Sequence, residues 1–295
     1  QGKYKKAYEI LKAIIPLAPN NKGLLSDTAF SLWRIGRLEE AAEKYEKVIT
    51  LDPNDDGIFY LLGDVYKDLK MLDKATNSLV KAIKLNPQNT SARFSLAGIY
   101  REKGEIKKAL QESHKIIKIN PNNPESHFQL GFLYSSMNDF DNALKSYKKA
   151  ISILPNYPDA HNNLGTTFHD LGLLDEAIES LEWAIAYKAD FAEAHNNLGN
   201  VMNDFGRMEA AVKCYKKAVQ YKPDYAKAYF NLAIAYKDLG NKEAYLKSIE
   251  KTILLKPEWG DAHLHLSRIK NYKENDPHTQ VMYSLLSSAS LTLID

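Results

Sequence analysis

Apolar and small residues recur along this chain at a fixed distance of 34 residues. If each repeat is numbered so that one recurring Gly or Ala is position 8, large apolar residues fall at positions 4, 7 and 11, as in Phe59, Leu62 and Tyr66. This i, i+3, i+7 spacing predicts one apolar face of a helix. Because position 8 lies within that face, a small residue there would let a second helix approach closely. Eight repeats then begin at Lys22, Asp56, Thr90, Pro124, Pro158, Ala192, Ala226 and Gly260.

The second half of each repeat predicts a second helix, with Ala at position 20 and a bulky residue at position 24. Glycine near position 15 would form the turn, since it tolerates the backbone of a helix C-terminus. Proline at position 32 would end the second helix, because it lacks an N–H group and clashes with the preceding turn. One helix pair cannot bury its apolar face alone, so neighbouring pairs are expected to share a continuous core. The prolines are Pro19, Pro53, Pro87, Pro121, Pro155, Pro223 and Pro257.

With this period and these positions, the chain resembles the tetratricopeptide repeat family over nearly its whole length. The resemblance implies an all-α fold, a right-handed superhelix (solenoid) of stacked antiparallel helix pairs. Residues 1–21 are interpreted as the second helix of an incomplete preceding repeat, 22–259 as seven repeats, and 260–295 as an eighth, atypical repeat. In that last segment Asp276-Pro277 predicts a helix start, and the apolar end predicts that a further domain follows.

Charge and motifs exclude several classes of function. The formal net charge is +2 at pH 7, so no bulk attraction to nucleic acid or to an anionic membrane is expected. No apolar stretch is long enough to span a bilayer, and no phosphate-binding loop, zinc spacing or serine-hydrolase motif occurs. The sequence therefore predicts a cytoplasmic chain with no catalytic residue, metal or cofactor in this segment.

Four of the eight histidines share position 4 of their repeats, and this common phase favours a packing role over catalysis or metal binding. Cys214 stands beside the buried position 24. We interpret it as an unreactive thiol, because no histidine is placed to pair with it. The four histidines are His127, His161, His195 and His263.

Polar positions on the other side of the first helix give the strongest functional signal. At 100° per residue, positions 2, 6, 9 and 13 point away from the apolar face. Repeats five to seven place Asn at position 6 and Asp at position 13, and repeat six is polar at all four positions. The candidate groove residues are Asn162, Asn163, Asn196, Asn197, Asn200, Asn203, Asn231, Asp170, Asp204 and Asp238.

In the family that the chain resembles, the first helices line a concave groove, which implies that these polar rows lie inside it. An asparagine amide offers both a donor and an acceptor and so matches the edge of an extended peptide backbone. An acidic row would favour basic or hydroxyl-bearing residues in the ligand. Alternatively, these asparagines are solvated or bond to neighbouring helices. Asparagine is a mediocre helix former, so its threefold recurrence in phase favours the groove.

The N-terminal repeats present apolar residues instead at or beside the groove positions. These residues would form a binding patch or would pack on the neighbouring first helix, and the sequence leaves both alternatives open. They are Phe30, Trp33, Phe94, Phe128 and Phe132.

Two finer resemblances bear on function. The A-H-N-N-L-G segments at 160–165 and 194–199 are similar to repeats of O-linked N-acetylglucosamine transferase, in which an asparagine row grips protein substrates. Residues 262–286, with D-P-H at 276–278, resemble the junction of repeats and a sulfotransferase domain in bacterial proteins. That junction would imply a missing part that binds 3′-phosphoadenosine 5′-phosphosulfate and transfers sulfuryl to a hydroxyl.

The predicted function is that of a protein–protein interaction scaffold, which binds an extended peptide or a partner protein in its groove. The alternatives are the substrate-recognition arm of a larger transferase, with sulfotransferase ahead of glycosyltransferase, and a spacer without a groove ligand. Neither the oligomeric state nor an enzymatic activity of a longer protein follows from this sequence.

Overall fold

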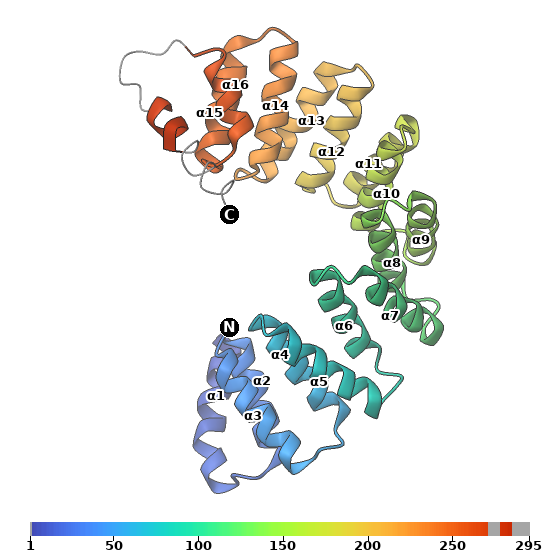
Figure 1. The fold of residues 1–295 in the computed structure, drawn as a ribbon, viewed down its shortest axis with the longest axis vertical. Coiled ribbons are helices and arrows are strands. Elements are labelled where there is room, and N and C mark those ends of the chain that lie inside the picture. Colours follow the sequence, from blue (N-terminus) through green and yellow to red (C-terminus); the bar gives the residue numbers. More distant parts are fainter. Residues whose placement is uncertain (1, 271–277, 285–295) are drawn as a thin grey trace. The chain divides into compact units, whose positions relative to one another are not determined.

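The computed structural model describes residues 2–270 and 278–284, and in these ranges the chain forms helices joined by short turns, with no strand. Its contacts fall into two compact units, residues 1–139 and 140–295, which are described separately (Figure 1). The all-α fold of stacked antiparallel helix pairs predicted from the period is confirmed in each unit. The helix start predicted at Asp276-Pro277 lies outside the described residues.

In unit one, consecutive helices pack against each other in chain order, so that the first helices α2, α4 and α6 each lie between two second helices. The elements are α1 (Gly2–Ile14), a 3-10 turn (Ile15–Leu17), α2 (Lys22–Arg34), α3 (Leu38–Leu51), α4 (Asp56–Asp68), α5 (Leu72–Leu85), α6 (Thr90–Glu102), α7 (Ile106–Ile119) and α8 (Pro124–Ser136).

Unit two repeats this arrangement. In both units neighbouring first helices also contact one another, α4 with α6 in unit one and α12 with both α10 and α14 in unit two. Residues 278–284 are helical as well. The elements are α9 (Phe140–Ile153), α10 (Pro158–Asp170), α11 (Leu174–Tyr187), α12 (Ala192–Asp204), α13 (Met208–Tyr221), α14 (Ala226–Asp238), α15 (Lys242–Leu255) and α16 (Gly260–Ser267).

All eight first helices, the even-numbered ones from α2 to α16, begin at the residue where the 34-residue period starts a repeat. Small residues at position 8 are required by the side chain at position 24. A Cβ atom on Gly199 would lie 2.5 Å from the Tyr215 ring, and one on Gly165 would lie 2.7 Å from Leu181 Cγ. Such contacts are too short for real atoms, so a larger residue would force the two helices apart.

Alanine at position 20 is fully buried in each repeat from one to six. Added methyl groups at such sites overpack a core and typically cost about 1–3 kcal/mol. The positions are Ala41, Ala75, Ala109, Ala143, Ala177 and Ala211, each with 0% exposure. Repeat seven places Tyr245 there, and its ring is 3% exposed with the hydroxyl 2.8 Å from His265 Nδ1. The tyrosine thus joins α15 to α16 without breaking the repeat.

The turn between the two helices of a repeat uses a left-handed residue at position 15. Gly172, for example, has a φ of +73°, which glycine adopts at no steric cost. Lys70 and Asn138 occupy the same position with φ values of 61° and 58°, so the turn keeps its shape in repeats two and four without glycine. The predicted turn is therefore set by the repeat geometry as well as by glycine.

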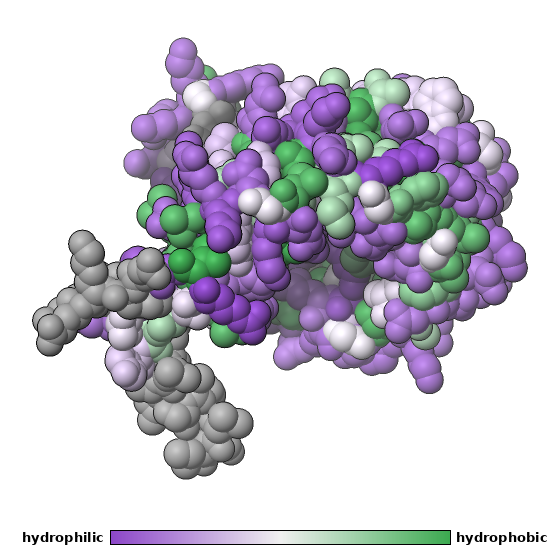
Figure 2. All heavy atoms as spheres, turned by 90° about the horizontal axis from the view of Figure 1, so that it is seen from above, coloured by the Kyte–Doolittle hydropathy of each residue, from purple (hydrophilic) through white to green (hydrophobic). Residues whose placement is uncertain are grey.

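Figure 2 shows that hydrophilic residues cover most of the molecular face seen from above, with hydrophobic residues in small groups between them. Within the described residues, no helix combines the length and the apolar character needed to cross a membrane.

Candidate functional site

Five asparagine side chains on three neighbouring first helices of unit two form a continuous chain of hydrogen bonds. Asn231 Nδ2 donates to Asn196 Oδ1 at 3.0 Å, and Asn196 Nδ2 donates to Asn197 Oδ1 at 3.5 Å. Asn197 Nδ2 donates in turn to Asn162 Oδ1 at 3.0 Å, and Asn162 Nδ2 donates to Asn163 Oδ1 at 3.1 Å. We call these five residues the asparagine network. It connects α14, α12 and α10 in one direction, from donor to acceptor.

Asn200, at position 9 of repeat six, is attached to the network from the side. Its Oδ1 accepts one hydrogen bond from Asn231 Nδ2 and one from the Tyr215 hydroxyl, each 2.9 Å long. Burial raises the pKa of Tyr215, so the hydroxyl remains a proton donor at neutral pH. Both lone pairs of the Asn200 oxygen are therefore used, whereas its amide hydrogens donate to none of the described residues.

The two asparagines at position 5 are buried, which differs from their predicted place in an open groove. Asn196 has 0% exposure and Asn162 has 8%. Both lie where neighbouring first helices touch, so their side chains bond to other asparagines and are shielded from a ligand. Asn163, Asn197 and Asn231, at position 6, are half-buried. Position 6 thus supplies the accessible amides, and position 5 orients them.

On its accessible side, the asparagine network uses most of its amide oxygens in hydrogen bonds but leaves several amide hydrogens unused. Asn163 accepts one bond and keeps both amide hydrogens, because they meet no acceptor among the described residues. Asn197 donates one hydrogen and retains the other. Asn231 uses both hydrogens and keeps a free carbonyl oxygen. We define the first-helix face as positions 6, 9 and 13 of α10, α12 and α14. Its asparagines offer mainly amide donors, with one free amide oxygen at the α14 end.

The predicted acidic row lies at the exposed ends of the same helices. Asp170, Asp204 and Asp238 are all exposed. Asp204 is already engaged, because its Oδ2 lies 2.8 Å from Nε2 of His169 in the preceding repeat. The other two carboxylates contact no basic group in the described part of the chain. Asn203 is half-buried and likewise makes no side-chain hydrogen bond there.

The position-4 histidines form a hydrogen bond that the sequence did not predict. Each ring Nε2 lies 2.7–3.0 Å from the carbonyl oxygen six residues earlier, at position 32 of the previous repeat. Because a carbonyl only accepts, Nε2 must carry the proton. All four rings are at most 9% exposed, which supports the predicted packing role. They are His127, His161, His195 and His263.

Cys214 is half-buried, and burial raises the pKa of its thiol. A raised pKa lowers the thiolate fraction at neutral pH, and the thiolate is the reactive form. This agrees with the interpretation of Cys214 as an unreactive residue.

In unit one, the apolar residues at the groove positions mostly pack on their neighbours. Phe30 makes edge-to-face contacts with Tyr4 and Trp33 at centroid distances of 5.9 and 6.0 Å. The Trp33 indole donates to Asp68 Oδ2 at 2.7 Å. Phe132 remains 39% exposed, with the Arg101 guanidinium 5.0 Å from its ring centre. Phe94 and Phe128 are half-buried.

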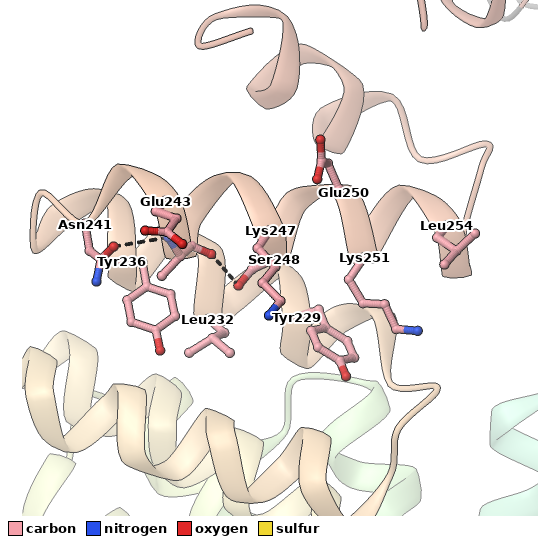
Figure 3. Close-up of a pocket in the computed structure, with 11 residues that line it drawn as sticks. Tyr229, Leu232, Tyr236, Asn241, Glu243, Lys247, Ser248, Glu250, Lys251 and Leu254 are labelled. Atoms are coloured by element: carbon pink, nitrogen blue, oxygen red, sulfur yellow. Dashed lines mark hydrogen bonds between the residues drawn. The ribbon is translucent and has the colours of Figure 1, made fainter. Parts of the chain in front are cut away.

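Unit two also has pockets on the opposite side of its first helices, next to the second helices. The larger one, of about 730 Å³, lies against α14 and α15. Tyr229, Leu232 and Tyr236 project into it from α14, with Lys247 and Lys251 of α15 beside them (Figure 3). A pocket of about 450 Å³ occupies the equivalent place around α9, α10 and α11.

Family comparisons agree with the repeat pattern. The TPR repeat family matches residues 32–70, 97–138, 134–172, 165–204 and 199–240. The tetratricopeptide repeat family also matches residues 57–89 and 226–258. These ranges together cover well over half of the chain. A comparison with curated protein sequences found no match.

Several solved structures share the fold. A tetratricopeptide repeat protein from Parabacteroides merdae superposes with a TM-score of 0.68 at 17% identity, over 85% of this chain and 99% of its own. A chain of the APC/C hetero-tetramer Cut9–Hcn1 superposes with a TM-score of 0.67 at 15% identity, over 91% of the present chain. The present chain spans about half (53%) of the length of that relative. YrrB, described as a TPR protein with an unusual peptide-binding site, gives 0.52 at 22% identity over 63% of this chain and 96% of its own.

Proposed function

Because the chain belongs to the tetratricopeptide repeat family, we propose that it is a protein-interaction scaffold that binds an extended peptide on the first-helix face of unit two. The observation that carries this proposal is the asparagine network. It holds three amides, those of Asn163, Asn197 and Asn231, at the same position of successive helices and in fixed orientations. The predicted alternative, an arm of a larger transferase, has no support in the family or structure matches.

The free amide groups match the main chain of a peptide. The unused hydrogens of Asn163, Asn197 and Asn200 would donate to peptide carbonyl oxygens, and the free oxygen of Asn231 would accept from a peptide N–H. Main-chain contacts of this kind do not depend on the ligand's side chains. The exposed carboxylates of Asp170 and Asp238 would add a preference for basic residues, through charge complementarity.

Bonding between neighbouring helices, which the sequence left as an alternative to peptide binding, is compatible with this function. Side chains that neighbouring residues already hold in place lose little conformational entropy when a ligand binds, and preorganisation of this kind favours affinity. The buried amides of Asn162 and Asn196 hold the position-6 asparagines in this way. The network therefore acts as support for binding groups rather than as a substitute for them.

The test uses the complete chain and an array of random nonapeptides. We expect extended peptides of varied sequence to bind, and the double variant Asn163→Ala/Asn197→Ala to weaken binding at least tenfold for all of them. Asn77→Ala is the matched control, because Asn77 is an exposed asparagine on the second helix α5, outside the first-helix face. Asn163→Asp keeps the acceptor for Asn162 but replaces the free donors by an oxygen. It should therefore lose binding with unchanged helicity.

Two results would contradict the proposal. One is that no peptide on the array binds the folded chain. The other is that the Asn163→Asp and double-alanine variants bind peptides as tightly as the original chain while circular dichroism shows intact helices.

A further inference from the structure

Helix α11 differs from the other second helices of unit two in charge. It carries four acidic residues and no lysine or arginine. In the next repeat, α13 has the same length and place but carries three lysines and one glutamate. The acidic residues of α11 are Asp175, Glu176, Glu179 and Glu182, all of them exposed.

Two of these carboxylates share one side of α11 with two large aromatic rings. Glu176, Glu179, Trp183 and Tyr187 are spaced i, i+3, i+7 and i+11, which places them along one face of a helix. We call these four residues the α11 stripe. Trp183 is 47% exposed and Tyr187 is 42% exposed. Adjacent exposed rings of this size are typical of the anchor residues of protein interfaces.

The two rings of the α11 stripe are held in place by contact with each other and with His161 of α10. Trp183 and Tyr187 stack with their centroids 5.7 Å apart and their planes 22° from parallel. His161 of α10 lies 5.5 Å from the Tyr187 ring and is fixed by its own bond to the Pro155 carbonyl. The Trp183 indole N–H donates to no acceptor among the described residues, so a ligand oxygen can take this bond.

Three residues of the stripe, Glu176, Glu179 and Trp183, line the pocket of about 450 Å³ between α9 and α11. Leu164 and Phe168 of α10 form an apolar floor, and Lys148 of α9 stands on the opposite wall with its ammonium 5.2 Å from the Phe168 ring centre. The chain thus already places one cation over an aromatic ring in this pocket. On the α11 side the pocket is lined by one further ring, that of Trp183, and by two carboxylates, which outnumber the single ammonium group of Lys148.

We propose that the α11 stripe binds an arginine- or lysine-containing segment of a protein partner. Aromatic faces attract guanidinium and ammonium groups, and the carboxylates of Glu176 and Glu179 complement the same charge. A cation over Trp183 would lie beside Glu179, one helical turn away. The unused indole N–H would then bind a carbonyl oxygen of the same segment. This surface is separate from the asparagine network, which lies on the other side of α10.

The test measures binding of the complete chain to a fluorescein-labelled Gly-Arg repeat octapeptide, with the Gly-Glu octapeptide as the charge control. We expect the basic peptide alone to bind, with affinity that falls as salt rises from 50 to 200 mM, since charge attraction is screened. Trp183→Ala and Glu179→Lys should each weaken binding at least tenfold.

Tyr221→Ala is the matched control. Tyr221 is 44% exposed and its ring centroid lies 5.5 Å from that of His195, the same distance as between Tyr187 and His161, but it belongs to the basic helix α13. This variant should bind the basic peptide as the original chain does. Trp183 and Glu179 are exposed, so their replacement should leave the helices intact, and circular dichroism checks this.

Three outcomes of these measurements would overturn the inference, and a fourth would move the binding site to the first-helix face. The basic peptide fails to bind at millimolar concentration; Trp183→Ala and Glu179→Lys bind it unchanged; or the chain self-associates through the stripe, so that light scattering shows a dimer that Trp183→Ala dissolves. If Asn163→Asp abolishes binding while Trp183→Ala does not, the peptide lies on the first-helix face. That result would support the proposed function and contradict this one.

Discussion

The Tyr215 hydroxyl donates a 2.9 Å hydrogen bond to Oδ1 of Asn200, which lies on the first helix of the same repeat. Tyr45 occupies the same position 24 in repeat one, with 0% exposure, yet its hydroxyl reaches no partner among the described residues. The difference follows from position 9, which is Asn200 in repeat six and Phe30 in repeat one. One buried tyrosine is therefore satisfied and the other is not.

This pair predicts opposite effects for the same mutation. Tyr215→Phe removes a net hydrogen bond and should cost about 0.5–1.5 kcal/mol. Tyr45→Phe removes a hydroxyl that is buried without a partner, so the unfolding free energy should stay unchanged or rise. Urea unfolding of both variants measures this. Equal losses in the two variants would show that Tyr45 has a partner in solution.

The buried amide of Asn196 should contribute to stability. Asn196→Ala removes two hydrogen bonds, one from Asn231 Nδ2 and one to Asn197 Oδ1, and each is worth about 0.5–1.5 kcal/mol net. Asn203→Ala, which breaks no hydrogen bond to a described residue, should change the unfolding free energy little. Thermal and urea unfolding compare the two. A loss of the same size in both variants would mean that helix propensity, rather than the network, is being measured.

Two glycine-to-alanine substitutions should act in opposite directions. In Gly199→Ala the new Cβ would lie 2.5 Å from the Tyr215 ring, and overpacking of this kind costs about 1–3 kcal/mol. Gly98→Ala adds a methyl group with no other atom within 4 Å, and alanine is favoured over glycine inside a helix by about 1 kcal/mol. The melting temperature should fall for the first variant and rise for the second. A rise for both would refute the close approach of α12 and α13.

Stability should depend on pH through His195. Burial, the largest cause, lowers its pKa below the ordinary value of 6.5. As the pH falls through 6.5, the unfolded chain therefore takes up a proton before the native chain does, and the unfolding free energy decreases. His195→Gln should make this decrease shallower between pH 7.5 and pH 5. Identical pH profiles for the two chains would exclude the contribution of His195.

The sequence predicted those features that depend on one repeat alone. The helix start at Lys22, the small residue Gly165 and the turn at Gly172 follow from local sterics, which recur in every copy. The sequence did not predict the burial of Asn196, because position 5 is covered by the first helix of a neighbouring repeat and not by the second helix of the same repeat. For the same reason, the contact between His169 and Asp204 was not foreseen. Contacts between repeats depend on how neighbouring helix pairs stack, and this stacking cannot be predicted from the sequence of a single repeat.

The asparagine network also has an evolutionary consequence. Position 6 of one repeat donates to position 5 of the repeat before it, both from Asn197 to Asn162 and from Asn231 to Asn196. The bond is thus the same at each junction. Excision of residues 192–225, one period in length, would bring Asn231 into the place of Asn197, opposite Asn162. A gene that gains or loses one such copy would lengthen or shorten the asparagine network by one junction and would need no new type of side-chain contact.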